Sequence, residues 1–244
     1  MRTVSLFLLL AITTAASAQH RRNNFMMPQS TLGLGVGIQE FDGLKSRMAN
    51  FSQYEELKDY SATLQLGWLK ERDRLISASS VMLGSSMSGD RDKKSSSVRF
   101  IGLGADIGYD LIKSKKTMLY PLAGIGYEFY QARFYTDNSG VDFDDVVGSP
   151  AVQNAIRPLA LRNSFFTYRL GMGVSLTGPK DHGGSIGLQA AYVGSFDKRE
   201  WKSNDNQVLS NAPEDRLGRF QVSLVLSHQP MMHGKNKSKK KPGR

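Results

Sequence analysis

Eight stretches of this chain alternate between apolar residues and residues that are mostly Gly, Ser, Thr or Gln. Alternation with a period of two is typical of β-strands that have two different faces. In residues 99–111, one face carries Ile, Leu, Ala, Ile, Tyr and Leu, and the other carries Gly, Gly, Asp, Gly and Asp. Solvent-facing strand positions of soluble proteins more often carry long charged side chains. Small residues there indicate a crowded interior, with the apolar face turned outward to lipid.

This pattern predicts an all-β fold, an eight-stranded antiparallel up-and-down transmembrane β-barrel. Most of the stretches exceed the roughly 9–11 residues that a tilted strand needs to cross a bilayer. The third stretch alternates too weakly for its faces to be assigned. The predicted strands are residues 30–41, 59–70, 75–87, 97–111, 117–134, 164–177, 184–196 and 217–229.

The connections between these strands alternate in length. The first, third, fifth and seventh are long (42–58, 88–96, 135–163 and 197–216), and the others are short (71–74, 112–116 and 178–183). Bacterial outer-membrane barrels have the same alternation of long outer loops and short periplasmic turns. The pattern therefore predicts an outer-membrane location, with both ends of the barrel on the periplasmic side.

Two of the long connections have features of short helices. Ser149 and Pro150 have the residue types of a helix N-cap and first position, which predicts a helix over 151–156. A turn of helix is also expected within 51–60.

The ends of the chain indicate export. Residues 1–18 have a basic start, an apolar run and a final Ala-Ser-Ala, the features of a secretory signal peptide. We expect a periplasmic N-terminal segment at 19–29, the barrel at 30–229 and a basic disordered periplasmic tail at 230–244. That tail contributes strongly to the net charge of +10. The chain has no cysteine, which excludes disulfides and a lipidated N-terminal cysteine.

Charged side chains on the predicted inner face form the candidate site, Asp106, Glu128, Arg169 and Arg219. An eight-stranded barrel is just wide enough inside to be filled by side chains. Charges buried there should pair, because an isolated one costs several kcal/mol to desolvate. We predict a Glu128–Arg169 pair, extended by Asp106 and Tyr130. The network either packs the interior or gates a narrow pore, and a filled lumen favours packing.

Aromatic residues are expected on the lipid-facing side near the strand ends, where they suit interfacial girdles. The candidates are Trp68, Tyr109, Tyr120, Tyr127, Phe129, Phe166, Tyr168, Tyr192 and Phe220.

The sequence predicts no catalytic, cofactor or metal site. Its four histidines, at 20, 182, 228 and 233, lie outside the long connections, so no outer loop supplies the histidine base that a nucleophile would use. The paired glycines lie mid-strand and do not complete a dinucleotide-binding motif. The acidic residues of 137–145 lack the spacing of an EF-hand loop. We expect a non-enzymatic protein.

The signal peptide, the eight strands, the sorted loops and the Gly-x-Gly pattern together resemble small outer-membrane barrels. The similar groups are the OmpA/OmpX-like transmembrane barrels and the PorT-like outer membrane protein beta-barrel family, and the resemblance covers about residues 30–229. It implies a structural role, loop-mediated binding, or an accessory role in envelope transport and secretion. Such barrels usually end in an aromatic residue, whereas this chain continues into its basic tail. No OmpA-like peptidoglycan-binding domain follows, so wall anchoring is not implied.

Three alternatives remain open at this point: a narrow passive pore, an outer-membrane lipid-modifying enzyme, and a soluble lipocalin-like carrier whose apolar face points inward. The expected partners are outer-membrane lipid and lipopolysaccharide, and envelope proteins that contact the outer loops or the basic tail. Nucleic acid is not an expected partner in that compartment. We expect the barrel to be a monomer.

Overall fold

The structure is a computed structural model that describes residues 28–90, 93–112, 114, 116–177, 184–205 and 207–228. The predicted signal peptide (1–18), most of the predicted N-terminal segment (19–29), the short turn at 178–183 and the basic tail (230–244) lie outside the described residues.

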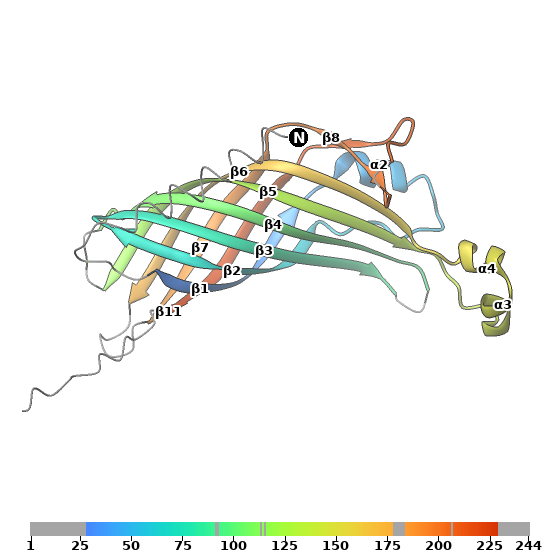
Figure 1. Cartoon of the computed structure of the whole chain (residues 1–244), viewed down its shortest axis with the longest axis horizontal. Helices are drawn as coiled ribbons and strands as arrows, with labels where there is room; N and C mark the ends of the chain where they lie inside the picture. The colour runs from blue at the N-terminus through green and yellow to red at the C-terminus, as the bar shows by residue number, and fades with distance from the viewer. Residues whose placement is uncertain are drawn as a thin grey trace, which may run out of the picture.

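Eight long antiparallel strands form a sheet that closes on itself, which confirms the predicted barrel (Figure 1). Strands that follow one another along the chain pair with each other, and the first long strand pairs with the last. Each long strand therefore has two partners, and closure leaves no open sheet edge facing lipid. The strands are β1 (Gln29–Gln39), β2 (Tyr60–Arg72), β3 (Leu75–Gly89), β4 (Ser95–Tyr109), β5 (Thr117–Tyr135), β6 (Leu159–Thr177), β7 (Gly184–Ser195) and β11 (Gly218–His228).

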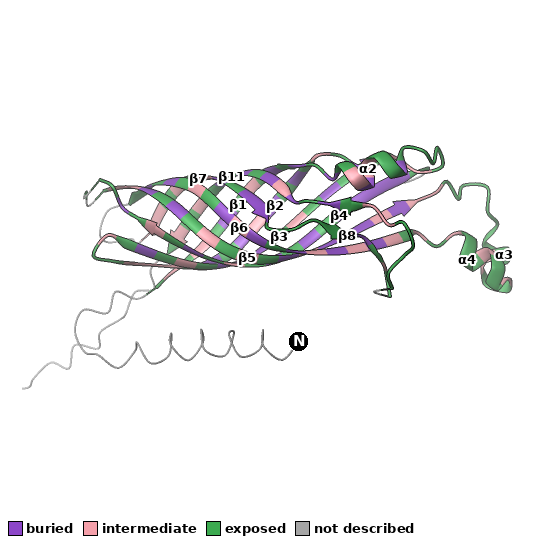
Figure 2. Cartoon of the chain, turned by 90° about the horizontal axis from the view of Figure 1, so that it is seen from above, coloured by how far each residue is buried: buried purple, intermediate pink, exposed green. Residues whose placement is uncertain are grey.

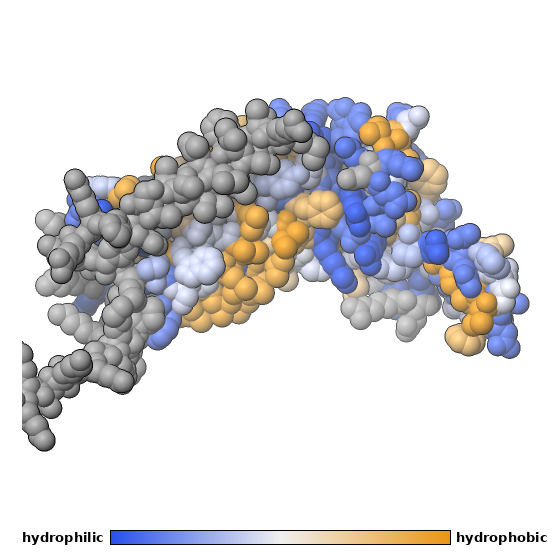
Figure 3. All heavy atoms as spheres, viewed as in Figure 1, coloured by the Kyte–Doolittle hydropathy of each residue, from blue (hydrophilic) through white to orange (hydrophobic). Residues whose placement is uncertain are grey.

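The outward faces of the strands are apolar. Ile107 is 64% exposed, whereas its neighbour Asp106 is 6% exposed. Figure 2 shows buried and exposed residues alternating along the strands, and Figure 3 shows an apolar area on the visible face of the barrel that gives way to hydrophilic surface toward the loop end. An apolar band on the outside of a closed barrel is suited to lipid. The alternative of a soluble carrier, which required the apolar face to point inward, is wrong.

The structure corrects the predicted face of one aromatic residue and assigns the faces of the third strand. Tyr120 was expected in the outer girdle but points inward and is 6% exposed, because Gly173 on the neighbouring strand leaves space for its ring. In β3, whose faces the sequence left open, Ile76 and Met82 point inward, and serines occur on both faces, three on each.

Strands β5 and β6 extend well beyond the apolar band at the loop end. Each has 19 residues, about 63 Å of strand, or about 45 Å of height at a tilt of about 45°. The apolar band of such barrels is only about 25 Å tall. β6 begins at Leu159 rather than at the predicted residue 164. Its first residues have left the membrane and no longer need an apolar outward face, so the alternation that marks a strand is lost there.

The long connections carry the remaining elements: α2 (Asp42–Met48), α3 (Phe143–Gly148), α4 (Pro150–Ala155), β8 (Arg199–Glu200), β9 (Lys202–Ser203) and β10 (Glu214–Asp215). α4 confirms the predicted helix, and the Ser149 side chain accepts a hydrogen bond from the Val152 N–H. The helix expected within 51–60 is wrong, since α2 lies earlier in the same loop. None of the helices in the described ranges is long and apolar enough to cross a membrane.

Candidate functional site

An ion pair spans the lumen. The Arg219 guanidinium of β11 donates to both carboxylate oxygens of Glu128 on β5, each at 2.7 Å. The Tyr130 hydroxyl donates to the same carboxylate at 2.7 Å, and the Arg219 guanidinium lies 4.2 Å from the centre of the Phe100 ring. Strands β11 and β5 are not neighbours, so this bidentate pair spans the interior.

A second ion pair lies closer to the short turns. Arg169 on β6 donates from Nη1 to the Asp106 carboxylate on β4 at 3.0 Å, and it also contacts the Met82 sulfur. Both partners of the pair are about 95% buried. The barrel interior therefore holds two separate, compensated pairs.

The predicted Glu128–Arg169 pair is wrong, although all four predicted lumen charges point inward. Register explains the different partners. Glu128 lies opposite Phe165 on β6, whereas Arg169 lies opposite Gly124, which is four residues before Glu128 on β5. Gly124 in turn lies opposite Asp106 on β4. Arg169 therefore meets Asp106 across a glycine, and Glu128 is left for Arg219.

The glycines of the inner face make room for these charged side chains. A Cβ atom at Gly124 would lie 2.0 Å from the Asp106 carboxylate, and one at Gly102 would lie 2.8 Å from Glu128 Cγ. Asp106 and Arg169 can meet across β5 only because the residue between them has no side chain. The glycine pattern and the charge pairs are two parts of one arrangement.

The first and last of the long loops close the outer mouth of the barrel. Phe41, from the first loop, packs between the rings of Tyr130 (centroids 5.2 Å apart) and Trp201 (5.4 Å), and it stacks near Phe165. Trp201 comes from the last loop and is fully buried. These rings, together with Leu44 of α2 and inward residues of the strands, form one apolar core. We call this core the outer cap.

Asp215 holds the outer cap together. Its carboxylate accepts hydrogen bonds from the Gly43 N–H (2.7 Å), the Leu44 N–H (3.0 Å) and Trp201 Nε1 (2.7 Å). It therefore caps the first turn of α2, which has no cap from its own side chains, and joins two loops that are far apart in sequence. The sequence analysis did not identify Asp215 or Trp201 as site residues. The only signal that could have done so is the presence of one tryptophan, Trp201, in a highly charged loop.

Lys45 fixes the first loop from the outside. Its ammonium donates to the Asp59 carboxylate at 3.1 Å and lies 3.4 Å from Glu56. Hydrogen bonding to Asp59 raises the pKa of the Lys45 ammonium above its ordinary value. This arrangement ties α2 to the start of β2.

Apolar side chains also obstruct the inner mouth. Ile76, Tyr120 and Leu122 form a second apolar cluster, against which Leu69 and Met118 pack. Cavities of about 20 and 30 Å³ remain beside it, and one of about 10 Å³ lies beside Arg169. Each has room for about one water molecule.

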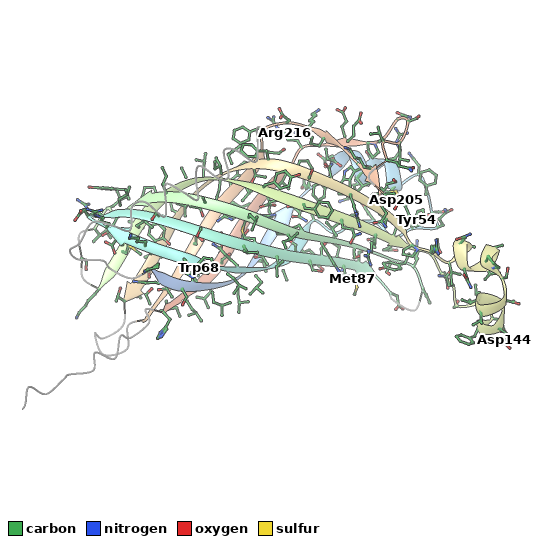
Figure 4. The ribbon with its side chains drawn as sticks, in the orientation of Figure 1. Tyr54, Trp68, Met87, Asp144, Asp205 and Arg216 are labelled. Carbon is green, nitrogen blue, oxygen red and sulfur yellow. The ribbon has the colours of Figure 1, made fainter. Side chains whose placement is uncertain are left out.

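The third outer loop stands apart from the outer cap. Its two helices, α3 and α4, project beyond the end of the barrel, with Asp144 at the far tip (Figures 1 and 4). Phe143 and Val147 on α3 are 76% and 64% exposed, next to Asp144 and Asp145. No group of side chains in the described residues could hold a metal ion.

A closed eight-stranded barrel with an apolar outer band, a filled interior and sorted loops is an integral outer-membrane β-barrel protein. This places the chain in the outer membrane, as predicted. The sequence matches no family model and no curated protein.

Several solved outer-membrane barrels are similar to this chain in fold. Ail, the attachment invasion locus protein of Yersinia pestis, has 13% identity and a TM-score of 0.44, covering 83% of this chain and 98% of its own. Neisserial surface protein A (NspA) has 9% identity and a TM-score of 0.47, covering 83% and 97%. A major outer membrane protein from Thermus thermophilus has 10% identity and a TM-score of 0.44, covering 82% and 98%.

Proposed function

We propose that the protein is a closed, non-enzymatic outer-membrane barrel that acts by loop-mediated binding, in a structural or transport-accessory role in the envelope. The observation that carries this proposal is the closure of the lumen at three levels. These levels are the outer cap around Phe41, the Arg219–Glu128 pair, and the inner cluster around Tyr120.

A narrow pore is the competing function. It would need a continuous aqueous path, whereas each of the lumen cavities given above has room for about one water molecule. An enzyme would need a base within reach of a nucleophile or a metal. The outer loops contain no histidine in the sequence, which favours a binding role over catalysis.

The third loop is the best candidate for the binding surface. Phe143 and Val147 are four residues apart on α3 and so form one exposed apolar patch, a feature that favours an interaction site. Asp142, Asp144 and Asp145 surround them with negative charge. A partner with a basic rim around an apolar contact would complement both features.

Site-specific photo-crosslinking in intact cells tests this proposal. A photoreactive amino acid at Phe143 should give one discrete crosslinked protein. The same group at Leu111, which is 51% exposed at the short-turn end, is the control and should not give that product.

Replacement of Asp142, Asp144 and Asp145 by Asn should abolish the crosslink while the barrel stays folded. The same product from both positions, or no product from Phe143, would contradict loop-mediated binding.

A further inference from the structure

A cavity of about 440 Å³ opens on the outside of the barrel wall, between β6 and the last outer loop. Figure 1 shows the orange β8 segment beside the outer end of β6. We call this cavity the wall pocket. Six charged side chains line it: Arg162, Lys198, Arg199, Lys202, Glu200 and Glu214.

The wall pocket has an excess of positive charge that the protein does not neutralise. Four cations against two carboxylates leave a formal charge of +2. Within the described part of the chain, none of the four cations forms an ion pair. The Nε of Arg162 is buried without a hydrogen-bond partner there. These are the features of a surface that can accept an anion.

The backbone of the wall pocket is held in place by the outer cap. Trp201 is anchored in the cap, so the adjacent Lys202 points away from the barrel interior. β9 pairs with β6 so that Lys202 lies opposite Arg162. The Asn163 side chain donates to the Arg199 carbonyl at 2.9 Å, which joins β8 to the wall.

The level of the wall pocket matches the headgroups of the outer leaflet. Four aromatic residues mark the top of the apolar band below it, with ring centroids 5.3–6.2 Å apart: Phe166, Tyr168, Tyr192 and Phe196. Arg162 lies four residues above Phe166 on β6, which corresponds to about 9 Å of height in a strand tilted by about 45°. The Arg162 guanidinium lies 5.8 Å from the Phe129 ring centre, so charge and apolar wall are adjacent.

We propose that the wall pocket binds the phosphorylated sugar headgroup of an outer-leaflet glycolipid. Arg162 and Lys202 take the phosphate, because guanidinium and ammonium groups form charge-assisted hydrogen bonds with it. Glu200 and Glu214 accept hydrogen bonds from sugar hydroxyls. The acyl chains of the lipid then lie along the aromatic residues and the apolar band below.

Lipid titration of the full-length protein in detergent, read by native mass spectrometry, tests this site. The probes are diphosphoryl lipid A, the same lipid without phosphates, and inorganic phosphate as a competitor. The test variant is Arg162→Gln/Lys202→Gln. The control is Arg72→Gln/Arg99→Gln, which removes the same amount of charge outside the pocket. Arg72 lies at the inner end of β2, and Arg99 lies on β4, two strands from β6. The heat-dependent gel shift of each variant confirms that it is folded.

The test variant should bind lipid A at least about tenfold more weakly than the wild type, since each charge-assisted bond is a large contribution. The control should change binding less than about twofold. Lipid A without phosphates should bind the wild type as weakly as it binds the test variant. Equal binding by wild type and test variant would overturn the site. Displacement of lipid A by millimolar inorganic phosphate would assign the pocket to a free anion instead. Crosslinking from Phe143 is a separate readout, so the two proposals fail independently.

Discussion

Gly124→Ala should break the Asp106–Arg169 pair, while Gly104→Ala should be tolerated. Both glycines point into the lumen from adjacent strands. A Cβ at position 124 would lie 2.0 Å from the Asp106 Oδ1 and 2.6 Å from the Ala105 carbonyl oxygen. A Cβ at position 104 would find its nearest atoms at 3.7 and 3.9 Å, which is ordinary van der Waals contact.

The size of the effect follows from what the new methyl group displaces. Asp106 must move, and Arg169 then stays buried without its counter-ion. Removing one partner of a buried pair typically costs about 3–5 kcal/mol, and overpacking alone costs about 1–3 kcal/mol. We therefore expect Gly124→Ala to lower the free energy of unfolding by about 3–5 kcal/mol. Gly104→Ala should change it by less than about 1 kcal/mol.

Urea unfolding in lipid vesicles, followed by tryptophan fluorescence, measures this difference. The chain has two tryptophans, one on the lipid-facing wall (Trp68) and one in the outer cap (Trp201). In an Asp106→Ala background the penalty of Gly124→Ala should shrink, because the group it displaces is gone. Equal stabilities for Gly124→Ala and Gly104→Ala would refute the idea that inner-face glycines exist to admit the charge pairs.

Three further changes test the interior and the cap. Glu128→Leu and Arg219→Leu should each lower the free energy of unfolding by about 3–5 kcal/mol in the same assay. The double variant should lower it by less than the sum of the two. Simple additivity would argue against the pair. Asp215→Asn should loosen α2, so that trypsin cuts at Lys45 faster than in the wild type, and unchanged proteolysis would contradict its capping role. Phe41→Ala should cost about 3–5 kcal/mol, as expected for a ring removed from a core, and a loss below about 1 kcal/mol would mean that the outer cap is not packed.

The faces of the barrel strands could be predicted from the sequence because apolar outward residues and small or polar inward residues alternate along most strands. Apolar residues opposite glycine indicated the inside and outside of seven strands. The faces of the third strand could not be assigned because serines occur equally on both of them while Ile76 and Met82 point inward. The prediction that Tyr120 faces lipid failed because the space for its ring inside the barrel comes from Gly173 on another strand.

The contacts within the site could not be predicted from the sequence, because they depend on register and on long-range meetings. Glu128 and Arg169 are both inward on neighbouring strands, yet the stagger of the barrel sets them four residues apart. Asp215 caps helix α2 by accepting a hydrogen bond from the Leu44 N–H, which is 171 residues away in the chain. No local pattern carries that information.

Electrical recording from the purified protein in planar lipid bilayers tests the central claim, that the lumen is closed. The wild-type barrel should insert without stepwise increases in conductance above the bare bilayer, since the outer cap, the Arg219–Glu128 pair and the inner cluster all obstruct the path. Reproducible ohmic steps from folded wild-type protein would contradict the account and establish a pore.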